Sequence, residues 1–205
     1  MQPATELHRF PPNLFVWQNY DPAVKAELFA SAISTPAGMY IVDPIPLAAD
    51  GVARLSEANK IAGVIVTNAN HHRASVDYSD EFSVPLFAQP GAFPDRKPRR
   101  SVEVADGTTI GEELEVITIN GAIPGEIALY HPLNGGTLVV GDALINFEPY
   151  GFAFLPRKYC INEREMQQSL RKLLGYKMQR LLFAHGTPIL SGASERLEQL
   201  LGLDR

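Results

Sequence analysis

Residues 61–73, IAGVIVTNANHHR, decide the fold of this chain. The first seven are an apolar run, which predicts a buried β-strand. Apolar residues at helical spacing precede the run and predict an amphipathic helix over residues 47–59. The two elements form a βαβ-like unit with the preceding strand, and residues 68–73 lie at the carboxyl end of its last strand. In α/β architectures this is where loops carry chemistry.

The flanking sequence predicts a mixture of strands and helices. Short apolar runs at 14–19, 27–34 and 38–42 are separated by turn residues, which indicates an antiparallel meander. After the decisive stretch, the pattern predicts helices at 74–82, 162–174 and 191–203 and strands at 85–88, 136–141 and 180–184, with short strands and turns over 101–130. Asn162 is a predicted N-cap, with Glu165 three residues later.

The composition limits the class of protein. With 205 residues and 45% hydrophobic content, the chain is long enough for one domain, which we expect to span residues 1–205. The net charge of −5 gives no electrostatic basis for binding nucleic acid or a membrane. The single cysteine, Cys160, and the absence of a signal-peptide pattern lead us to expect a cytoplasmic protein.

Polar residues stand at the ends of four predicted strands, and their order resembles the metallo-β-lactamase superfamily. In that family an early strand ends in Asp-Pro or Asp-Gly, matched here by Asp43-Pro44, and a second ends in Thr-His-x-His-x-Asp-His, matched by residues 67–73. Later marks are a Gly-His before a Pro-Gly turn (121–125 here), a Gly-Asp (Gly141-Asp142) and a His-Gly (His185-Gly186). The resemblance covers nearly the whole chain and implies an α+β fold, a four-layer αββα sandwich.

The resemblance also implies that the family's first zinc site is lost. Its three histidines correspond to Asn68, Asn70 and Ala122, none of which supplies an imidazole. The second site corresponds to His72, Arg73 and His185, with Asp142 as the bridging carboxylate. Arg73 places a permanent positive charge where a ligand is expected.

We therefore expect Arg73 to replace the metal and to form an ion pair with Asp142, with Asp43 or His185 close by. The predicted cofactor is none. The alternative is a single zinc or iron ion held by His72, Asp142 and His185. His71, at an arbitrary position of the family motif, is expected to point into solvent.

These expectations favour a metal-free pseudoenzyme or small-molecule-binding protein of unknown process over an enzyme. The first alternative is a mononuclear-metal hydrolase of an ester, thioester or lactone, and the second is a non-catalytic interaction subunit. The predicted partner is an unknown small molecule, with no indication of oligomeric state. Phosphate-binding and nucleophile-elbow motifs are missing, and Cys160 has no neighbouring His to activate it, so it is expected to be structural.

Overall fold

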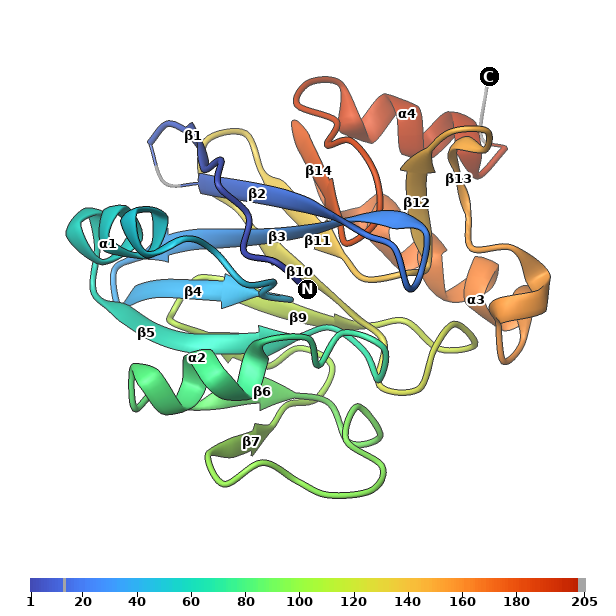
Figure 1. The fold of residues 1–205 in the computed structure, drawn as a ribbon. Coiled ribbons are helices and arrows are strands. Elements are labelled where there is room, and N and C mark those ends of the chain that lie inside the picture. The colour runs from blue at the N-terminus through green and yellow to red at the C-terminus, as the bar shows by residue number, and fades with distance from the viewer. Residues whose placement is uncertain (13, 203–205) are drawn as a thin grey trace.

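A computed structural model describes residues 1–12 and 14–202, and two β-sheets make up its centre (Figure 1). The first sheet has the order β1-β2-β3-β4-β5-β6-β7. Its strands are β1 (His8–Phe10), β2 (Leu14–Asp21), β3 (Ala26–Thr35), β4 (Gly38–Val42), β5 (Ile61–Val66), β6 (Leu86–Ala88) and β7 (Ser101–Glu103). Strands β1 to β4 are antiparallel, and β2 to β4 correspond to the predicted meander; β4 to β7 are parallel.

The second sheet has the order β14-β11-β10-β9-β8. Its strands are β8 (Thr109–Ile110), β9 (Leu114–Thr118), β10 (Ile127–His131), β11 (Thr137–Val140) and β14 (Arg180–Phe183). Among the described residues of this sheet, β11 and β14 pair in parallel, and the other neighbouring strands pair antiparallel. Strands β12 (Leu144–Phe147) and β13 (Gly151–Phe154) form a separate hairpin.

The helices follow the predicted positions with some differences at their ends. They are α1 (Ala49–Ala58), α2 (Ser75–Glu81), α3 (Glu163–Leu170) and α4 (Ala193–Leu200), with 3-10 turns η1 (Arg157–Tyr159) and η2 (Arg171–Gly175). The Asn162 side chain caps α3 by accepting a hydrogen bond from the Glu165 N–H, as its position predicted. The predicted helix 162–174 changes to a 3-10 turn after Leu170. The predicted end of the last helix at residue 203 lies outside the described residues.

Three clusters of buried side chains show how the layers pack. One cluster joins the two sheets through residues such as Ile65 and Leu129. A second lies between the first sheet and helices α1 and α2 and includes Leu55. The third lies between the second sheet and helices α3 and α4 and includes Met166 and Leu197. The order of layers is therefore helix, sheet, sheet, helix, which confirms the predicted αββα sandwich.

The parallel pairs bring the functional loops together. Strands β4 and β5 are parallel in the first sheet, and β11 and β14 are parallel in the second, so each pair ends at one edge of its sheet. The polar residues that follow these strands meet there. None of the helices in the described residues is long and apolar enough to cross a membrane. The single domain and the cytoplasmic location stay predictions.

Candidate metal centre

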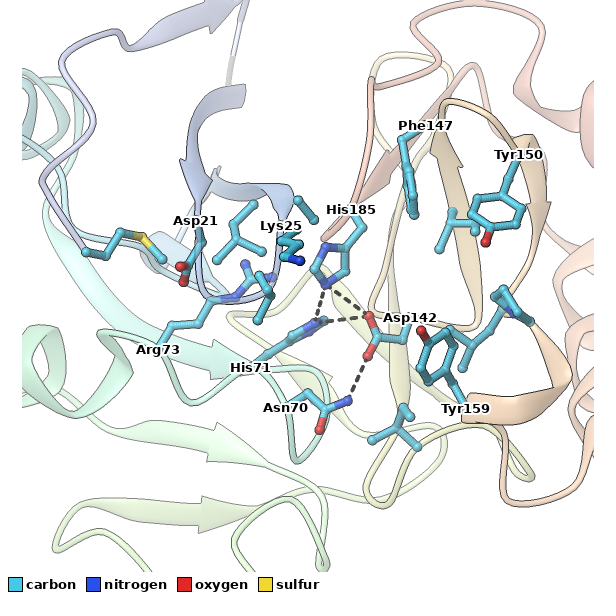
Figure 2. Close-up of a pocket in the computed structure, with 18 of the residues that line it drawn as sticks. Asp21, Lys25, Asn70, His71, Arg73, Asp142, Phe147, Tyr150, Tyr159 and His185 are labelled. Atoms are coloured by element: carbon cyan, nitrogen blue, oxygen red, sulfur yellow. Dashed lines mark hydrogen bonds and ion pairs between the residues drawn. The ribbon is translucent and has the colours of Figure 1, made fainter.

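A cavity of about 1100 Å³ opens where these strand ends meet. Figure 2 shows His71, Asp142 and His185 at its centre, with Asp21, Lys25 and Arg73 on one side and Phe147, Tyr150 and Tyr159 on the other. The three central residues follow β5, β11 and β14 respectively. Side chains more than a hundred residues apart thus share one cavity.

The central residues place three potential ligand atoms close together. The Asp142 Oδ1 atom lies 3.1 Å from His71 Nε2 and 3.4 Å from His185 Nε2. The two histidine Nε2 atoms are 3.4 Å apart. This group can hold a metal ion. His71 is 1% exposed and Asp142 5% exposed, so both are largely shielded from bulk water.

The other ring nitrogen of His71, Nδ1, is held by Asp43 and Thr67. His71 Nδ1 lies 2.9 Å from Asp43 Oδ2 and 2.9 Å from Thr67 Oγ1. Asp43 is itself held, because the Thr67 N–H donates to its Oδ1 at 2.8 Å and the Thr67 hydroxyl donates to its Oδ2 at 2.5 Å. A carboxylate behind a ligating histidine fixes the tautomer and the orientation of the ring. Asp43 thus orients the His71 ring so that its Nε2 atom faces Asp142 and His185.

The buried charges shift one another's pKa values in the metal-free site. Burial disfavours the charged form of His71, but the carboxylates of Asp142 and Asp43 outweigh it and raise its pKa to about 9. Burial likewise opposes ionisation of Asp142 and Asp43. The charge and hydrogen bonds of His71 nevertheless lower the pKa of each carboxyl group below the usual value for aspartate. Burial lowers the pKa of His185 to about 4, against the attraction of Asp142. At neutral pH, His71 is therefore charged between two carboxylates, and His185 is neutral.

The three positions that correspond to the family's first zinc site face different surroundings. Asn68 is fully buried and donates its side-chain N–H to Glu126 Oε2 at 2.7 Å. Its Oδ1 accepts the Asn70 N–H at 2.8 Å, and Asn70 lines the cavity and donates to Asp142 Oδ2 at 3.3 Å. Ala122 is fully buried in the core cluster between the second sheet and its helices. Only Asn70 of the three faces the cavity.

Glu126 is a site residue that sequence reasoning missed. Its Oε1 accepts the N–H of Asp142 at 2.7 Å and that of Ala143 at 3.1 Å, so it holds the turn that carries the Asp142 carboxylate. It is 1% exposed, and burial together with Asp142 raises its pKa well above the usual value. No motif marks it. The only signal was its position between the Pro124-Gly125 turn and the strand that begins at Ile127.

The structure exchanges the expected roles of two neighbouring histidines. His72 was the expected ligand, but its ring stacks on Phe93 at 4.1 Å and its Nε2 contacts the Ala92 carbonyl oxygen. His71 was expected to point into solvent, and this expectation was wrong. Assigning the ligands by their position in the motif assumed that the backbone of this loop follows the same path as in the family. The Asn68 side chain instead closes a turn at Asn70, and Arg73 has a φ of 38°, so the loop turns His71 inward.

The expected Arg73–Asp142 ion pair was also wrong. The Arg73 guanidinium donates to the carbonyl oxygens of Phe29 at 2.7 Å, Asp43 at 3.1 Å and Ala184 at 3.3 Å. Asp142 is partnered by His71, His185 and Asn70. The charge that balances Asp142 therefore comes from His71, and Arg73 joins three backbone segments.

The prediction of no cofactor is contradicted by this geometry. It rested on the loss of the first zinc site and on a guanidinium placed in the second. The guanidinium binds carbonyl groups instead, and His71 supplies with Asp142 and His185 a ligand set that motif counting had not included. Of the alternative ligands expected for a single metal, Asp142 and His185 belong to the group, whereas His72 does not.

Comparison with known proteins agrees with the architecture. The family model described as the metallo-beta-lactamase superfamily matches residues 5–202. No curated protein matches the chain. Among solved structures, DIM-1 metallo-beta-lactamase superposes with a TM-score of 0.74 at 14% identity, over 97% of each chain. A metallo-beta-lactamase from Pontibacter korlensis gives 0.74 at 13% identity, over 97% of this chain and 99% of that one.

A longer protein gives the same fold. A metallo-beta-lactamase family protein from Thermus thermophilus superposes with a TM-score of 0.67 at 18% identity, over 94% of this chain and 79% of that one. At such identities the structures establish the fold, and their activities do not carry over to this chain. With a family model matching almost its full length, the chain belongs to the metallo-β-lactamase superfamily as a divergent member.

Proposed function

We propose that the chain is a metal-dependent hydrolase that acts on an ester, thioester or lactone through a one-metal centre at His71, Asp142 and His185. One observation supports this most: three ligand atoms from three strand ends lie within 3.4 Å of one another at the centre of a large cavity.

The ligand atoms fit a metal ion in number, type and spacing. Two imidazoles and one carboxylate are a donor set found in catalytic zinc sites and in non-haem iron(II) sites. Corners of a tetrahedron about 2.0–2.1 Å from a central zinc ion are roughly 3.3 Å apart. The observed separations of 3.1 to 3.4 Å match this edge. Three protein ligands also leave a coordination position open, as catalytic sites require.

The surrounding residues would prepare the site for hydrolysis. When bound, a zinc ion supplies a Lewis acid that lowers the pKa of water toward neutrality. Asp43 orients His71, Glu126 holds the backbone N–H of Asp142, and Asn70 donates to the second oxygen of Asp142. These contacts fix the ligand side chains before any substrate enters, which lowers the cost of organising the site.

The pseudoenzyme interpretation depended on a metal-free pocket, and the group of His71, Asp142 and His185 supports a metal-binding pocket instead. Matched variants of the two adjacent histidines provide the test, because only His71 lies in the ligand group.

Protein purified without chelators is analysed for zinc, iron and manganese, and its hydrolysis of p-nitrophenyl acetate, S-phenyl thioacetate and dihydrocoumarin is measured. We expect about one equivalent of metal and turnover of at least one substrate. Both should be lost in His71→Ala and kept in His72→Ala. Less than about a tenth of an equivalent after incubation with excess zinc, or full metal content in His71→Ala, would refute the metal centre. Stoichiometric metal without turnover would refute the hydrolase assignment alone.

A further inference from the structure

The cavity has two unlike walls on either side of the metal centre. The first is the end of β2 and the loop before β3, with Asp21, Val24 and Lys25. The second comes from the β12–β13 hairpin and the segment after it, and its members are Phe147, Tyr150, Leu155, Pro156 and Tyr159. Figure 2 shows the labelled residues of the two walls facing each other across His71, Asp142 and His185. A ligand at the centre would contact both walls.

The second wall exposes aromatic rings to solvent. Tyr150 is 51% exposed and Tyr159 is 55% exposed, and Phe147 packs edge-on against Tyr150 with ring centres 5.6 Å apart. On the opposite wall, Val24 is 58% exposed. Exposed apolar groups gathered around one cavity mark a ligand-binding surface more often than scattered ones do. Their arrangement suits a flat apolar group that stacks on the tyrosines.

The first wall carries an unpaired positive charge. Among the described residues, the Lys25 ammonium group takes part in no ion pair or hydrogen bond. The other lysine of the cavity, Lys158, lies over the Tyr159 ring at 4.6 Å, so its charge already has a partner. The Asp21 carboxylate accepts the Ala23 N–H at 2.8 Å. Lys25 thus offers this wall an ammonium group that is free to meet an anion.

We propose that the substrate of this cavity is an amphiphilic anion, with an aromatic or similarly flat body against Phe147, Tyr150 and Tyr159 and a carboxylate at Lys25. The inference rests on the proposed function only in that the bond to be hydrolysed would lie between these two ends, at the metal centre. A cavity of about 1100 Å³ is large enough for such a molecule.

Three matched probes separate the two parts of the proposal. 4-Phenylbutanoate carries ring and carboxylate, 4-phenylbutanamide lacks the charge, and butanoate lacks the ring. Isothermal titration calorimetry on protein as purified and after chelator treatment measures binding without any need for turnover. We expect 4-phenylbutanoate to bind about two- to fivefold more tightly than the amide, which is the gain in affinity expected from one exposed ion pair. Butanoate should bind at least about tenfold more weakly, because it loses the aromatic contacts.

Variants assign each part to its wall. Lys25→Gln should lower the affinity for 4-phenylbutanoate to that for the amide and leave amide binding unchanged. Lys60→Gln, an exposed lysine outside the cavity, should change neither. The double variant Tyr150→Ala, Tyr159→Ala should weaken both phenyl probes about tenfold.

Each part of the proposal has its own contrary result. Equal binding of the amide and the carboxylate, or no effect of Lys25→Gln, would overturn the anion site. Unchanged binding by the double tyrosine variant would overturn the aromatic wall. Because these titrations do not depend on catalysis, a failed hydrolase assay with the expected binding pattern would refute the proposed function and uphold the ligand class.

Discussion

His71 uses both of its ring nitrogens, and this gives the site a measurable dependence on pH. Nδ1 contacts Asp43 and Nε2 contacts Asp142, which together raise the pKa of His71 to about 9 in the metal-free protein. A metal ion needs the Nε2 lone pair, so it must displace the Nε2 proton. Asp142, with its lowered pKa, is already ionised near neutral pH, and His185, with a pKa of about 4, is already neutral, so neither needs to lose a proton to bind a metal.

At pH 6, where a zinc-bound water still keeps its proton, zinc binding should therefore release about one proton per ion. Below the pKa of about 9, protonated His71 competes with the metal, so apparent zinc affinity should rise about tenfold per pH unit from pH 5.5 to 6.5. Calorimetric titration in buffers of different ionisation enthalpy measures the released protons. A release of zero or two protons would contradict the charge assignment of the three ligands. His72→Ala is the control, since His72 lies outside the ligand group.

Arg73 acts on the same site through the backbone. Its guanidinium donates to carbonyl oxygens of β3, of the residue after β4 and of the residue after β14, and these elements surround the cavity. Arg73→Met removes charge-assisted hydrogen bonds and should lower the free energy of unfolding by roughly 2 to 4 kcal/mol. Urea unfolding monitored by circular dichroism measures the loss. Arg99→Met, at an exposed position, should change stability by less than about 0.5 kcal/mol. Equal effects of the two variants would show that Arg73 does not join these segments.

The turn after β11 is the element on which the position of Asp142 depends. A Cβ atom at Gly141 would lie 2.7 Å from each of three polar atoms, Asn68 Nδ2, Glu126 Oε1 and Thr67 Oγ1. These atoms belong to buried side chains that hydrogen-bond to one another and to Asp43, so moving them aside would disturb those bonds. Glycine at this position therefore allows β11 to approach the end of β5 closely enough for Asp142 to meet His71.

Gly141→Ala should consequently lower the free energy of unfolding by about 1 to 3 kcal/mol and weaken zinc binding at least about tenfold. Gly175→Ala is the matched control, because a Cβ atom there meets nothing within 4 Å. It should leave zinc binding unchanged and alter stability by less than about 1 kcal/mol. Chemical unfolding and zinc titration of both variants provide the comparison. Zinc affinity equal to that of the parent in Gly141→Ala would show that the turn does not determine the position of Asp142.

At the scale of the whole molecule, the ligands of the proposed metal centre come from both sheets. His71 follows β5 of the first sheet, whereas Asp142 and His185 follow β11 and β14 of the second. An apolar cluster also lies between the two sheets. A metal bound to all three ligands requires the native arrangement of both halves, so its binding energy contributes to folding stability.

Free zinc at a hundred times its dissociation constant should raise the free energy of unfolding by about 2.7 kcal/mol. The rise should appear as a higher melting temperature in the parent and in His72→Ala, and it should be missing in His71→Ala. Thermal melting monitored by circular dichroism, with and without zinc, measures the change. A shift of similar size in His71→Ala would place the stabilising ion elsewhere.

The sequence by itself determined the fold and the strand ends where the site lies. Apolar runs of strand length, the helical spacing before Ile61 and the N-cap Asn162 are local signals, because each depends on side chains near one another in the chain. They predicted the individual strands and helices, whereas the αββα layers and the site positions Asp43, Asp142 and His185 followed from the resemblance to the metallo-β-lactamase superfamily. The sequence alone also showed that Asn68, Asn70 and Ala122 stand where the family has the three histidines of its first zinc site.

Only the tertiary structure decided which side chains meet. The choice of His71 over His72 depends on a turn closed by Asn68 and on the backbone conformation at Arg73, which motif counting does not describe. Glu126, directly before β10, belongs to the site because its carboxylate accepts the N–H of Asp142, a residue 16 positions later in the chain. Arg73 finds carbonyl groups rather than a carboxylate because three separate segments pass around it. Such contacts join residues distant in sequence, so their geometry arises only when the two sheets pack together.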